Sequence, residues 1–252
     1  MPVMRETAVD IIRHLKDAGH DAYLVGGCVR DELRGVAPQD HDIATSAHPD
    51  EVEKLFTKTV GVGRQFGVML VVEQRQQYQV ATFRSDAEYI DGRRPTSVTF
   101  SNAKTDAKRR DFTINGLFLD PVTDTLHDWV DGQADLEAKQ LRTIGKPKER
   151  FGEDHLRLLR AVRFAAQLDF EIEPETFDAV RELAEKIQSV SAERIRDELI
   201  KLFCPPHAAR GLDLLHDSGL MAHVLPELLP TINCDQSSDY HPEGSVYNHI
   251  RL

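Results

Sequence analysis

The hydrophobic pattern of the chain changes near residue 150. Before it, apolar positions show helical spacing at 5–18 and from Pro49 onward, between short runs typical of β-strands. Those strand-like runs cover 22–25, 42–44, 68–72, 78–83 and 98–100. After it, successive helical patterns cover 153–168, 175–188, 192–203 and 207–218. We therefore predict an α+β chain, with a mixed α/β domain over residues 1–150 and an all-α domain over residues 151–235.

The composition is that of a globular protein large enough for two domains. The chain has 252 residues, of which 40% are hydrophobic, and no run of about 18 apolar residues predicts a membrane span. Its three cysteines, Cys28, Cys204 and Cys234, lie too far apart for metal-ligand spacing, which favours a reducing, cytoplasmic location. The net charge of -11 argues against unspecific coating of nucleic acid, although a local basic groove stays compatible with it.

Two aspartates separated by one residue, Asp40 and Asp42, suggest a metal site. In an extended segment, side chains i and i+2 leave the same face, so both carboxylates would point to one place. That arrangement suits Mg²⁺, which binds carboxylates together with substrate phosphates. Upstream, Gly26 and Gly27 would let the backbone approach a phosphate, and Arg30 adds hydrogen-bond donors. The alternative is a solvated pair, because aspartate is frequent in turns.

Four segments in a fixed order carry a resemblance to a known family. They are 26–31 with 40–42, 91–95, 108–115 and 153–164, which read GGCVRD with DHD, DGRRP, KRRDFTIN and EDHLRLLRAVRF. In this order they resemble the class II tRNA nucleotidyltransferases, which comprise CCA-adding enzymes and bacterial poly(A) polymerases. The resemblance runs from about residue 20 to residue 204 and includes a helix start at 191–195. It implies a nucleotidyltransferase head followed by a helical neck and body that bind nucleotide and RNA.

The resemblance assigns the chemistry of the head. Asp40 and Asp42 would hold two Mg²⁺ ions that activate the RNA 3′-hydroxyl and clamp the triphosphate, so that attack on the α-phosphate releases pyrophosphate. Gly27, Arg30 and Arg110 would contact the phosphates. An ordinary tight turn at Gly27 and a helix-surface charge at Arg30 are the alternatives, while a glycine-rich turn into a helix start favours an anion.

By the same resemblance, Asp111 would accept a hydrogen bond from the ribose 2′-hydroxyl and so exclude deoxynucleotides. The competing interpretation is an N-cap on a helix that begins after Asp111. Lys108 and Arg109 fit a solvated basic edge as well as they fit an RNA contact.

The predicted helix from Glu153 carries Asp154, Arg157, Arg160 and Arg163 at a spacing of three, which would place them on one slowly turning stripe. By resemblance, Asp154 and Arg157 read the incoming base, and Arg160 and Arg163 contact the triphosphate and the base side. Cytosine and adenine offer an amino donor beside a ring-nitrogen acceptor, which a carboxylate and a guanidinium match. Uracil and guanine would leave buried polar groups unpaired, at roughly 1–3 kcal/mol each. For Asp154 and Arg157, the alternative is a surface salt bridge.

Two further positions leave alternatives open. Residues 91–95 resemble the family's flexible loop, which is linked to the change of specificity from C to A, but generic turn chemistry explains the same residues. Many nucleotidyltransferases carry a third carboxylate on a neighbouring strand, and here that position is Gln79. Because an amide is a poorer Mg²⁺ ligand, either two aspartates suffice, water completes the metal shell, or activity is reduced.

The last residues, 236–252, resemble the start of an HD-type phosphohydrolase domain. No His-Asp pair follows, so the segment is not expected to bind metal alone, and His241 and His249 receive no catalytic role. A tRNA-gripping tail would also be missing, which predicts weak affinity for tRNA.

The resemblance therefore predicts an enzyme that adds CCA to tRNA 3′ ends without a template, using CTP, ATP and Mg²⁺. A poly(A) polymerase and a partial enzyme that adds only CC or only A share nearly all of these motifs. The alternative from another class is a non-catalytic RNA-binding relative, which Gln79 and the C-terminal end suggest. Intact Asp40 and Asp42 argue against that alternative, and the sequence leaves the oligomeric state open.

Overall fold

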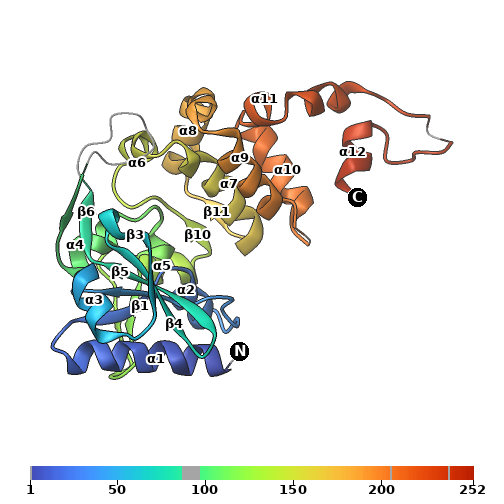
Figure 1. The fold of residues 1–252 in the computed structure, drawn as a ribbon. Coiled ribbons are helices and arrows are strands. Elements are labelled where there is room, and N and C mark those ends of the chain that lie inside the picture. Colours follow the sequence, from blue (N-terminus) through green and yellow to red (C-terminus); the bar gives the residue numbers. More distant parts are fainter. Residues whose placement is uncertain (1, 87–96, 205, 238) are drawn as a thin grey trace. The chain divides into compact units, whose positions relative to one another are not determined.

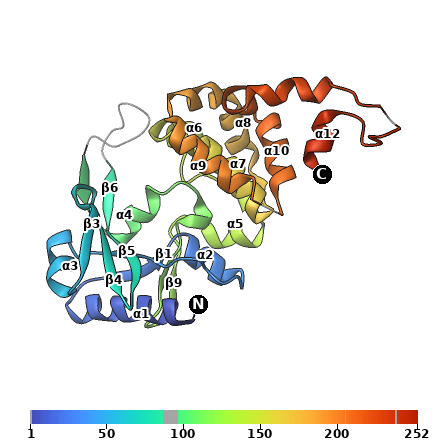
Figure 2. The ribbon, with the colours of Figure 1, turned by 45° about the vertical axis from the view of Figure 1, so that its right-hand side comes forward.

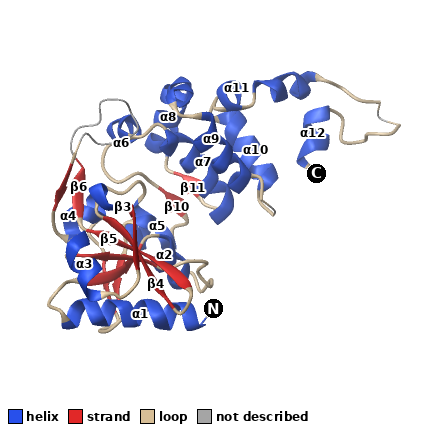
Figure 3. Cartoon of the chain, in the orientation of Figure 1, coloured by secondary structure: helices blue, strands red, loops and turns tan. Residues whose placement is uncertain are grey.

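The structure is a computed structural model that describes residues 2–86, 97–204, 206–237 and 239–252. It divides into two compact units, the first holding the described residues up to Ala138 and the second those from Lys139 to Leu252. Figure 3 shows most strands in the first unit, where helices accompany them, and mainly helices in the second. The predicted α+β class is thus confirmed, while the division falls earlier than the expected boundary near residue 150. The loop predicted at 91–95 lies outside the described residues.

A mixed sheet forms the centre of the first unit. Among the described residues its strand order is β3-β4-β5-β2-β1-β8-β9. The strands are β1 (Ala22–Val25), β2 (Asp42–Thr45), β3 (Thr59–Gly63), β4 (Val68–Glu73), β5 (Gln76–Thr82), β8 (Phe118–Asp120) and β9 (Thr125–His127). β2 runs parallel to β5, and the other neighbours are antiparallel. A separate antiparallel pair joins β6 (Arg84–Asp86) to β7 (Val98–Phe100).

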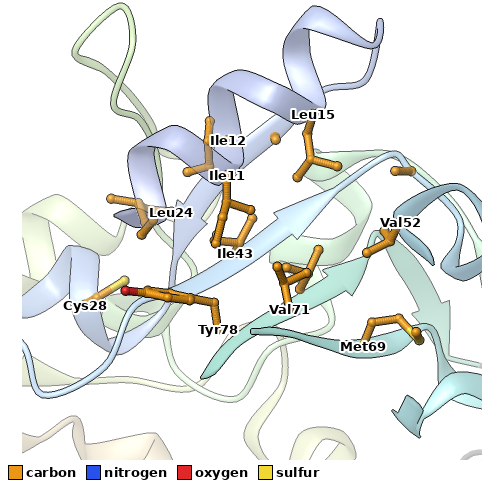
Figure 4. Packing of buried hydrophobic residues seen from close by; sticks show 14 of the residues in the cluster. Ile11, Ile12, Leu15, Leu24, Cys28, Ile43, Val52, Met69, Val71 and Tyr78 are labelled. Carbon is orange, nitrogen blue, oxygen red and sulfur yellow. The ribbon is translucent and has the colours of Figure 1, made fainter. Parts of the chain in front are cut away.

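One face of this sheet is covered by α1 (Pro2–Asp17), which packs against β1 and β2 (Figure 1). α3 (Pro49–Leu55) packs on the same cluster through Val52. Apolar residues of α1 at helical spacing meet alternate residues of the strands, because helix and strand expose one side at periods of about 3.6 and 2 residues. Figure 4 shows this core, formed by Ile11, Ile12, Leu15, Leu24, Cys28, Ile43, Val52, Met69, Val71 and Tyr78.

The opposite face of the sheet carries a smaller apolar cluster. It consists of Val25, Ala44, Phe83, Ala107 and Phe118. Ala107 comes from α4 (Ala103–Lys108), so this helix lies on the second face. Leu24 and Ile43 lie on the face of α1, and the next residues, Val25 and Ala44, lie on the opposite face. Because side chains alternate along a strand, Asp42 projects from the same face as Ala44.

The second unit is built around α7 (Leu156–Leu168), which packs against α9 (Ala192–Leu202) and α10 (Ala208–Asp217) (Figure 2). The other helices are α6 (Pro147–Glu153), α8 (Pro174–Leu183), α11 (Met221–Val224) and α12 (Val246–Arg251), with 3-10 segments at Ala184–Ser189 and Pro226–Asn233. The helices predicted at 192–203 and 207–218 are confirmed. A parallel pair of two-residue strands, β10 (Gln140–Leu141) and β11 (Glu171–Ile172), means that the unit is not purely helical.

The single helix predicted over 153–168 is wrong at its start. α6 ends at Glu153 and α7 begins at Leu156, and between them Asp154 has an extended backbone, with φ -146 and ψ 106. The Asp154 carboxylate accepts a hydrogen bond from the Leu156 amide at 3.1 Å, which favours the break. Asp154 therefore precedes the helix that carries the three arginines. None of the described helices combines the length and apolar character that a bilayer crossing requires.

Candidate active site

The centre of the sheet positions Asp42 beside the Gly-Gly turn. β1 pairs antiparallel with β2, so that Val25 lies opposite Asp42, and on its other side Val25 lies opposite Phe118 of β8. The next residues, Gly26 and Gly27, therefore leave the sheet next to Asp42. Gly27 is the first residue of α2 (Gly27–Leu33). Two motifs separated by more than ten residues in sequence thus meet at one place.

The side chains of Asp40 and Asp42 make no direct polar contact with another described residue. Asp40 is exposed and Asp42 is half-buried, and neither carboxylate has a hydrogen-bond or ion-pair partner within the described part of the chain. His41 lies between them and is buried, with its Nε2 3.6 Å from Glu32 Oε1. Asp42 is the first residue of β2, and the charge of Asp40 acts on it, so the two carboxylates lie near each other.

The electrostatics of this pair fit a divalent cation. Burial, and then the charge of Asp40, raise the pKa of Asp42 to about 6, while Arg110 and His41 act in the opposite direction. Two carboxylates that repel each other in a partly dehydrated place are relieved by a hard cation with oxygen ligands. Asp40 and Asp42 could therefore supply the protein ligands of a divalent metal ion.

Gln79 lies in the position expected for a third carboxylate. β5 runs beside β2 with Val80 opposite Ile43, and both of these residues lie in the core. One residue earlier on each strand, Asp42 and Gln79 therefore project from the other face as neighbours. Gln79 is exposed and offers an amide oxygen in place of a carboxylate.

Arg30 is buried, so it is not the free surface charge that one interpretation required. Its side chain is 9% exposed. Its Nη1 donates to Asn115 Oδ1 at 2.8 Å, and its Nε and Nη2 donate to the Asp31 carboxylate at 2.9 and 3.0 Å. A Cβ at Gly27 would lie 3.6 Å from Arg30 Nη2, so the guanidinium lies close to the start of α2.

Asp111 is linked to Arg30 through Asn115, a residue to which the sequence analysis gave no role. Asp111 Oδ1 accepts from the Phe112 amide at 2.8 Å and from Asn115 Nδ2 at 3.1 Å. The following 3-10 turn, Thr113–Asn115, has Phe112 at its N-cap position, so the N-cap interpretation of Asp111 is wrong. Asn115 is 7% exposed and bridges two predicted nucleotide contacts.

Arg110 lies on the same side of the sheet as Asp42. Its guanidinium carbon is 4.9 Å from the centre of the Phe118 ring, and it donates to the Asp106 carboxylate from Nε at 3.3 Å and Nη2 at 3.1 Å. Arg109 also donates to Asp106, at 2.8 Å, so it is not simply part of a solvated basic edge. Asp106 is another residue that the sequence analysis missed, because an aspartate in a short helix gives no distinct signal.

In the second unit, Asp154 is paired with Arg194. Two hydrogen bonds, of 3.2 and 2.8 Å, run from Arg194 Nη1 and Nη2 to the two carboxylate oxygens. Arg194 belongs to the segment 191–195, whose only assigned role was a helix start. Ser191 is indeed the N-cap of α9.

Within the described residues, Arg157 forms its ion pair with Glu153 and not with Asp154. Its Nη1 donates to the Glu153 carboxylate and to the Arg150 carbonyl, the latter at 2.9 Å. Arg150 donates to the same glutamate at 2.8 Å. The structure thus places Asp154 and Arg157 at the junction of α6 and α7, each with its own ionic partner.

Arg163 and Arg160 lie next to a buried glutamate. Arg163 is 7% exposed and donates from Nε to Glu198, which is 4% exposed. Arg160 Nη1 lies 3.8 Å from the same carboxylate, and the Phe164 ring lies beneath both guanidinium groups. These contacts give both arginines a structural role, and their predicted contact with nucleotide stays a prediction.

The C-terminal segment contains a cluster that was not expected. His241 Nδ1 and His249 Nδ1 lie 3.1 and 2.5 Å from Glu243 Oε1, and one ligand atom from each residue falls within 4.8 Å of the others. The geometry of this grouping allows a metal ion, and the expectation that the segment binds none alone stays a prediction. Ion pairs between the imidazoles and Glu243 account for the same geometry.

Comparisons with known proteins agree with the resemblance. The Poly A polymerase head domain family matches residues 22–142, and the family described as the probable RNA and SrmB-binding site of polymerase A matches residues 169–231. The CCA-adding enzyme of Geobacillus kaustophilus is 46% identical over 87% of this chain and 54% of its own length. That of Streptococcus suis is 43% identical over 90% of this chain and 56% of its own length.

A solved structure shows the same fold. The crystal structure of the Bacillus stearothermophilus CCA-adding enzyme in complex with CTP has a TM-score of 0.78 and 42% identity, covering 84% of this chain and 52% of that one. The chain thus spans about half the length of the relatives that it matches. It belongs to the class II tRNA nucleotidyltransferase and poly(A) polymerase family.

Proposed function

We propose that this chain carries the catalytic part of an enzyme that adds CCA to tRNA 3′ ends without a template, from CTP and ATP. The observation that carries the proposal is the pair Asp40 and Asp42 beside the Gly26-Gly27 turn, with neither carboxylate hydrogen-bonded or ion-paired to a described residue. The relatives named above are CCA-adding enzymes, and one of them binds CTP in its crystal structure.

The metal that fits the pair is Mg²⁺, a hard cation that retains waters and binds phosphate oxygens. When bound, it would lower the pKa of the RNA 3′-hydroxyl and neutralise charge on the triphosphate. Asp40 and Asp42 would hold it. Gly27 at the start of α2, Arg30 and Arg110 would bind and orient the phosphates, and Asp111 would accept the ribose 2′-hydroxyl.

Base selection would rest on Asp154 and Arg157. Arg194 fixes the direction of the Asp154 carboxylate, and Glu153 does the same for the Arg157 guanidinium. A held acceptor and a held donor can match the amino group and ring nitrogen of cytosine and adenine. Because the pair is already oriented, uracil and guanine cannot recover their lost hydrogen bonds by side-chain rotation. Arg160 and Arg163 would contact the triphosphate and the base side.

The proposal is tested by offering labelled CTP and ATP, separately and together, with a tRNA that ends before CCA and with an unrelated RNA. Ordered addition of C, C and A to the tRNA supports it. Asp40→Asn and Asp42→Asn should abolish incorporation while the fold persists, whereas Asp10→Asn, an exposed aspartate of α1, should not. Near-normal turnover by either site variant would end the metal assignment.

A poly(A) polymerase is the second candidate, because the matching head-domain family bears that name. Long A tails on both RNAs would favour it, addition of only CC or only A would favour a partial enzyme, and binding without incorporation would favour the non-catalytic relative. Binding to tRNA, a cytoplasmic location and the identity of the ion as Mg²⁺ stay predictions.

A further inference from the structure

Asp106 is a deeply buried carboxylate that holds two consecutive arginines. Its side chain is 2% exposed. Oδ1 accepts from Arg109 Nε at 2.8 Å and from the Arg84 amide at 3.2 Å, and Oδ2 accepts from Arg110. Burial by itself would raise the pKa of Asp106, yet Arg110 and Arg109 hold it below its usual value. The carboxylate is therefore charged and occupied on both oxygens.

Arg110 is held by two elements and lies close to a third. Asp106, one helical turn earlier, binds its Nε and Nη2, and the Phe118 ring of β8 lies under its guanidinium. On the third side is Gly26, where an added Cβ would lie 3.2 Å from Arg110 Nη1. The φ of +75 at Gly26 is itself a conformation that favours glycine.

The contacts of Arg110 are unevenly distributed over its nitrogens. Nε and Nη2 donate to Asp106, whereas Nη1, at the Gly26 turn, donates to none of the residues that the structure describes. The positive charge of Arg110 also acts on Asp42, where it opposes the rise in pKa that burial and Asp40 cause. The Nε and Nη2 edge of the guanidinium is thus anchored. Nη1 lies at the Gly26-Gly27 turn, which follows β1 next to Asp42.

We infer that Asp106 is a positioning residue, which anchors Arg110 so that Nη1 can donate to a phosphate of the incoming nucleotide at the Gly26-Gly27 turn. The inference rests on the proposed function for the identity of the ligand. A free arginine side chain loses rotamer entropy when it is ordered, and the bond to Asp106 removes that loss from the binding step. Asp106 is a positioning residue in this arrangement, because its effect on the phosphate passes through Arg110.

A double-mutant cycle tests the inference. Asp106→Asn is expected to raise the KM for both CTP and ATP by roughly tenfold or more, with a smaller change in kcat, because a charge-assisted bond that orients a phosphate donor is lost. On the Arg110→Ala background, Asp106→Asn should add little further change, since its target is already absent. Additive effects in the double variant would overturn the inference.

Asp120→Asn is the matched control. Asp120 is also a buried aspartate of the first unit, 6% exposed and paired with Lys16, but it contacts neither Arg109 nor Arg110 in any described bond. Asp120→Asn should lower the free energy of unfolding, as Asp106→Asn does, and should leave the KM for CTP unchanged. Equal KM effects from the two variants would show that Asp106 matters only for folding.

A binding measurement distinguishes a role of Asp106 in positioning Arg110 from a role in the stability of the fold. Inorganic tripolyphosphate carries the anionic part of the nucleotide and CMP lacks most of it, so Asp106→Asn should weaken the first by roughly tenfold and hardly change the second. If Asp106→Asn fails to fold, Asp106→Glu keeps the charge, displaces the carboxylate and should weaken tripolyphosphate in the same way. Equal losses for both ligands would contradict the inference.

The two proposals fail in different ways. Without incorporation of CTP or ATP on any RNA, the proposed function falls, while selective loss of tripolyphosphate binding in Asp106→Asn would still support the role of Asp106. Conversely, normal CCA addition with normal tripolyphosphate binding by a folded Asp106→Asn variant would overturn only the inference about Asp106.

Discussion

Arg194 donates two hydrogen bonds to the carboxylate of Asp154, at 2.8 and 3.2 Å, from the first turn of α9. The residues are forty positions apart, and their contact joins α9 to the junction of α6 and α7. The same carboxylate accepts the Leu156 amide, so its direction is set by one neighbour in sequence and one distant residue. Asp154 can therefore present a fixed acceptor only while Arg194 is in place.

Arg194→Ala should relax base selection. With its partner gone, Asp154 can rotate and solvate, so incorporation of UTP and GTP relative to CTP and ATP should rise by roughly ten- to a hundredfold. The measurement is single-nucleotide incorporation with each of the four triphosphates. Arg196→Ala, which removes an exposed arginine paired with Asp197, is the control. Unchanged ratios in Arg194→Ala would contradict a role for Asp154 in reading the base.

Gly26→Ala should impair nucleotide binding beyond its effect on stability. The substitution forces a side chain into φ +75 and puts its Cβ 3.2 Å from Arg110 Nη1. Gly19→Ala is a matched control, because Gly19 has φ +90 and nothing within 4 Å of the added carbon. Both should cost about 1–2 kcal/mol of unfolding free energy. Only Gly26→Ala should raise the KM for CTP. A similar rise in KM for Gly19→Ala would contradict the prediction that the new Cβ at residue 26 acts by displacing Arg110.

Asp42→Asn should stabilise the metal-free protein at neutral and higher pH. The pKa of Asp42 rises from 3.8 to about 6 in the folded state, so across that window the native protein holds a proton that the unfolded chain releases. Stability therefore falls as pH rises through this range, and the asparagine variant escapes the loss. At pH 8 we expect a gain of about 1–3 kcal/mol, which disappears near pH 3. Urea unfolding with a chelator measures it, with Asp10→Asn as control.

The same comparison can be repeated with Mg²⁺. Added Mg²⁺ should stabilise the parent protein at pH 8, because binding to the native state alone shifts the equilibrium, and should not stabilise Asp42→Asn. Equal stabilisation of both proteins would show that the ion binds elsewhere.

Glu198→Ala should be strongly destabilising. Glu198 is 4% exposed and neutralises Arg163, which is 7% exposed, so its loss leaves a buried guanidinium without its carboxylate. The expected cost is about 3–5 kcal/mol. Asp197→Ala, at the next position and half exposed, should change the unfolding free energy by less than about 1 kcal/mol. A small effect of Glu198→Ala in urea unfolding would contradict the importance of this pair.

The sequence predicted the strand that carries Gln79 because Tyr78 and Val80 alternate with polar residues, and it predicted the strand of Asp42 from a short β-rich run. It missed β3, whose residues Thr59–Gly63 include two glycines and bury none of their side chains fully. The pattern also joined α6 to α7, because apolar spacing continues across Asp154. The Asp154 carboxylate binds the Leu156 amide and Arg194, forty residues away, and apolar spacing reveals neither contact.

The predicted site residues of the first unit are brought together, but the residues that hold them were not foreseen. Asp106 and Asn115 act through buried hydrogen bonds to Arg110 and Arg30, and such bonds depend on the packing of α4 and the turn after Asp111. A sequence motif identifies the residues that contact a ligand. The residues that orient them, such as Asp106 and Asn115, can be recognised only from their contacts in the folded chain.

The position of Cys28 has a practical consequence. Packed behind Asp42 in the core, it is 2% exposed, and burial raises the pKa of its thiol to about 12. Cys204 and Cys234 are both exposed and both belong to the second unit. A maleimide dye at neutral pH should therefore label the helical unit alone, which provides fluorescent reporters of its movements without engineering the head.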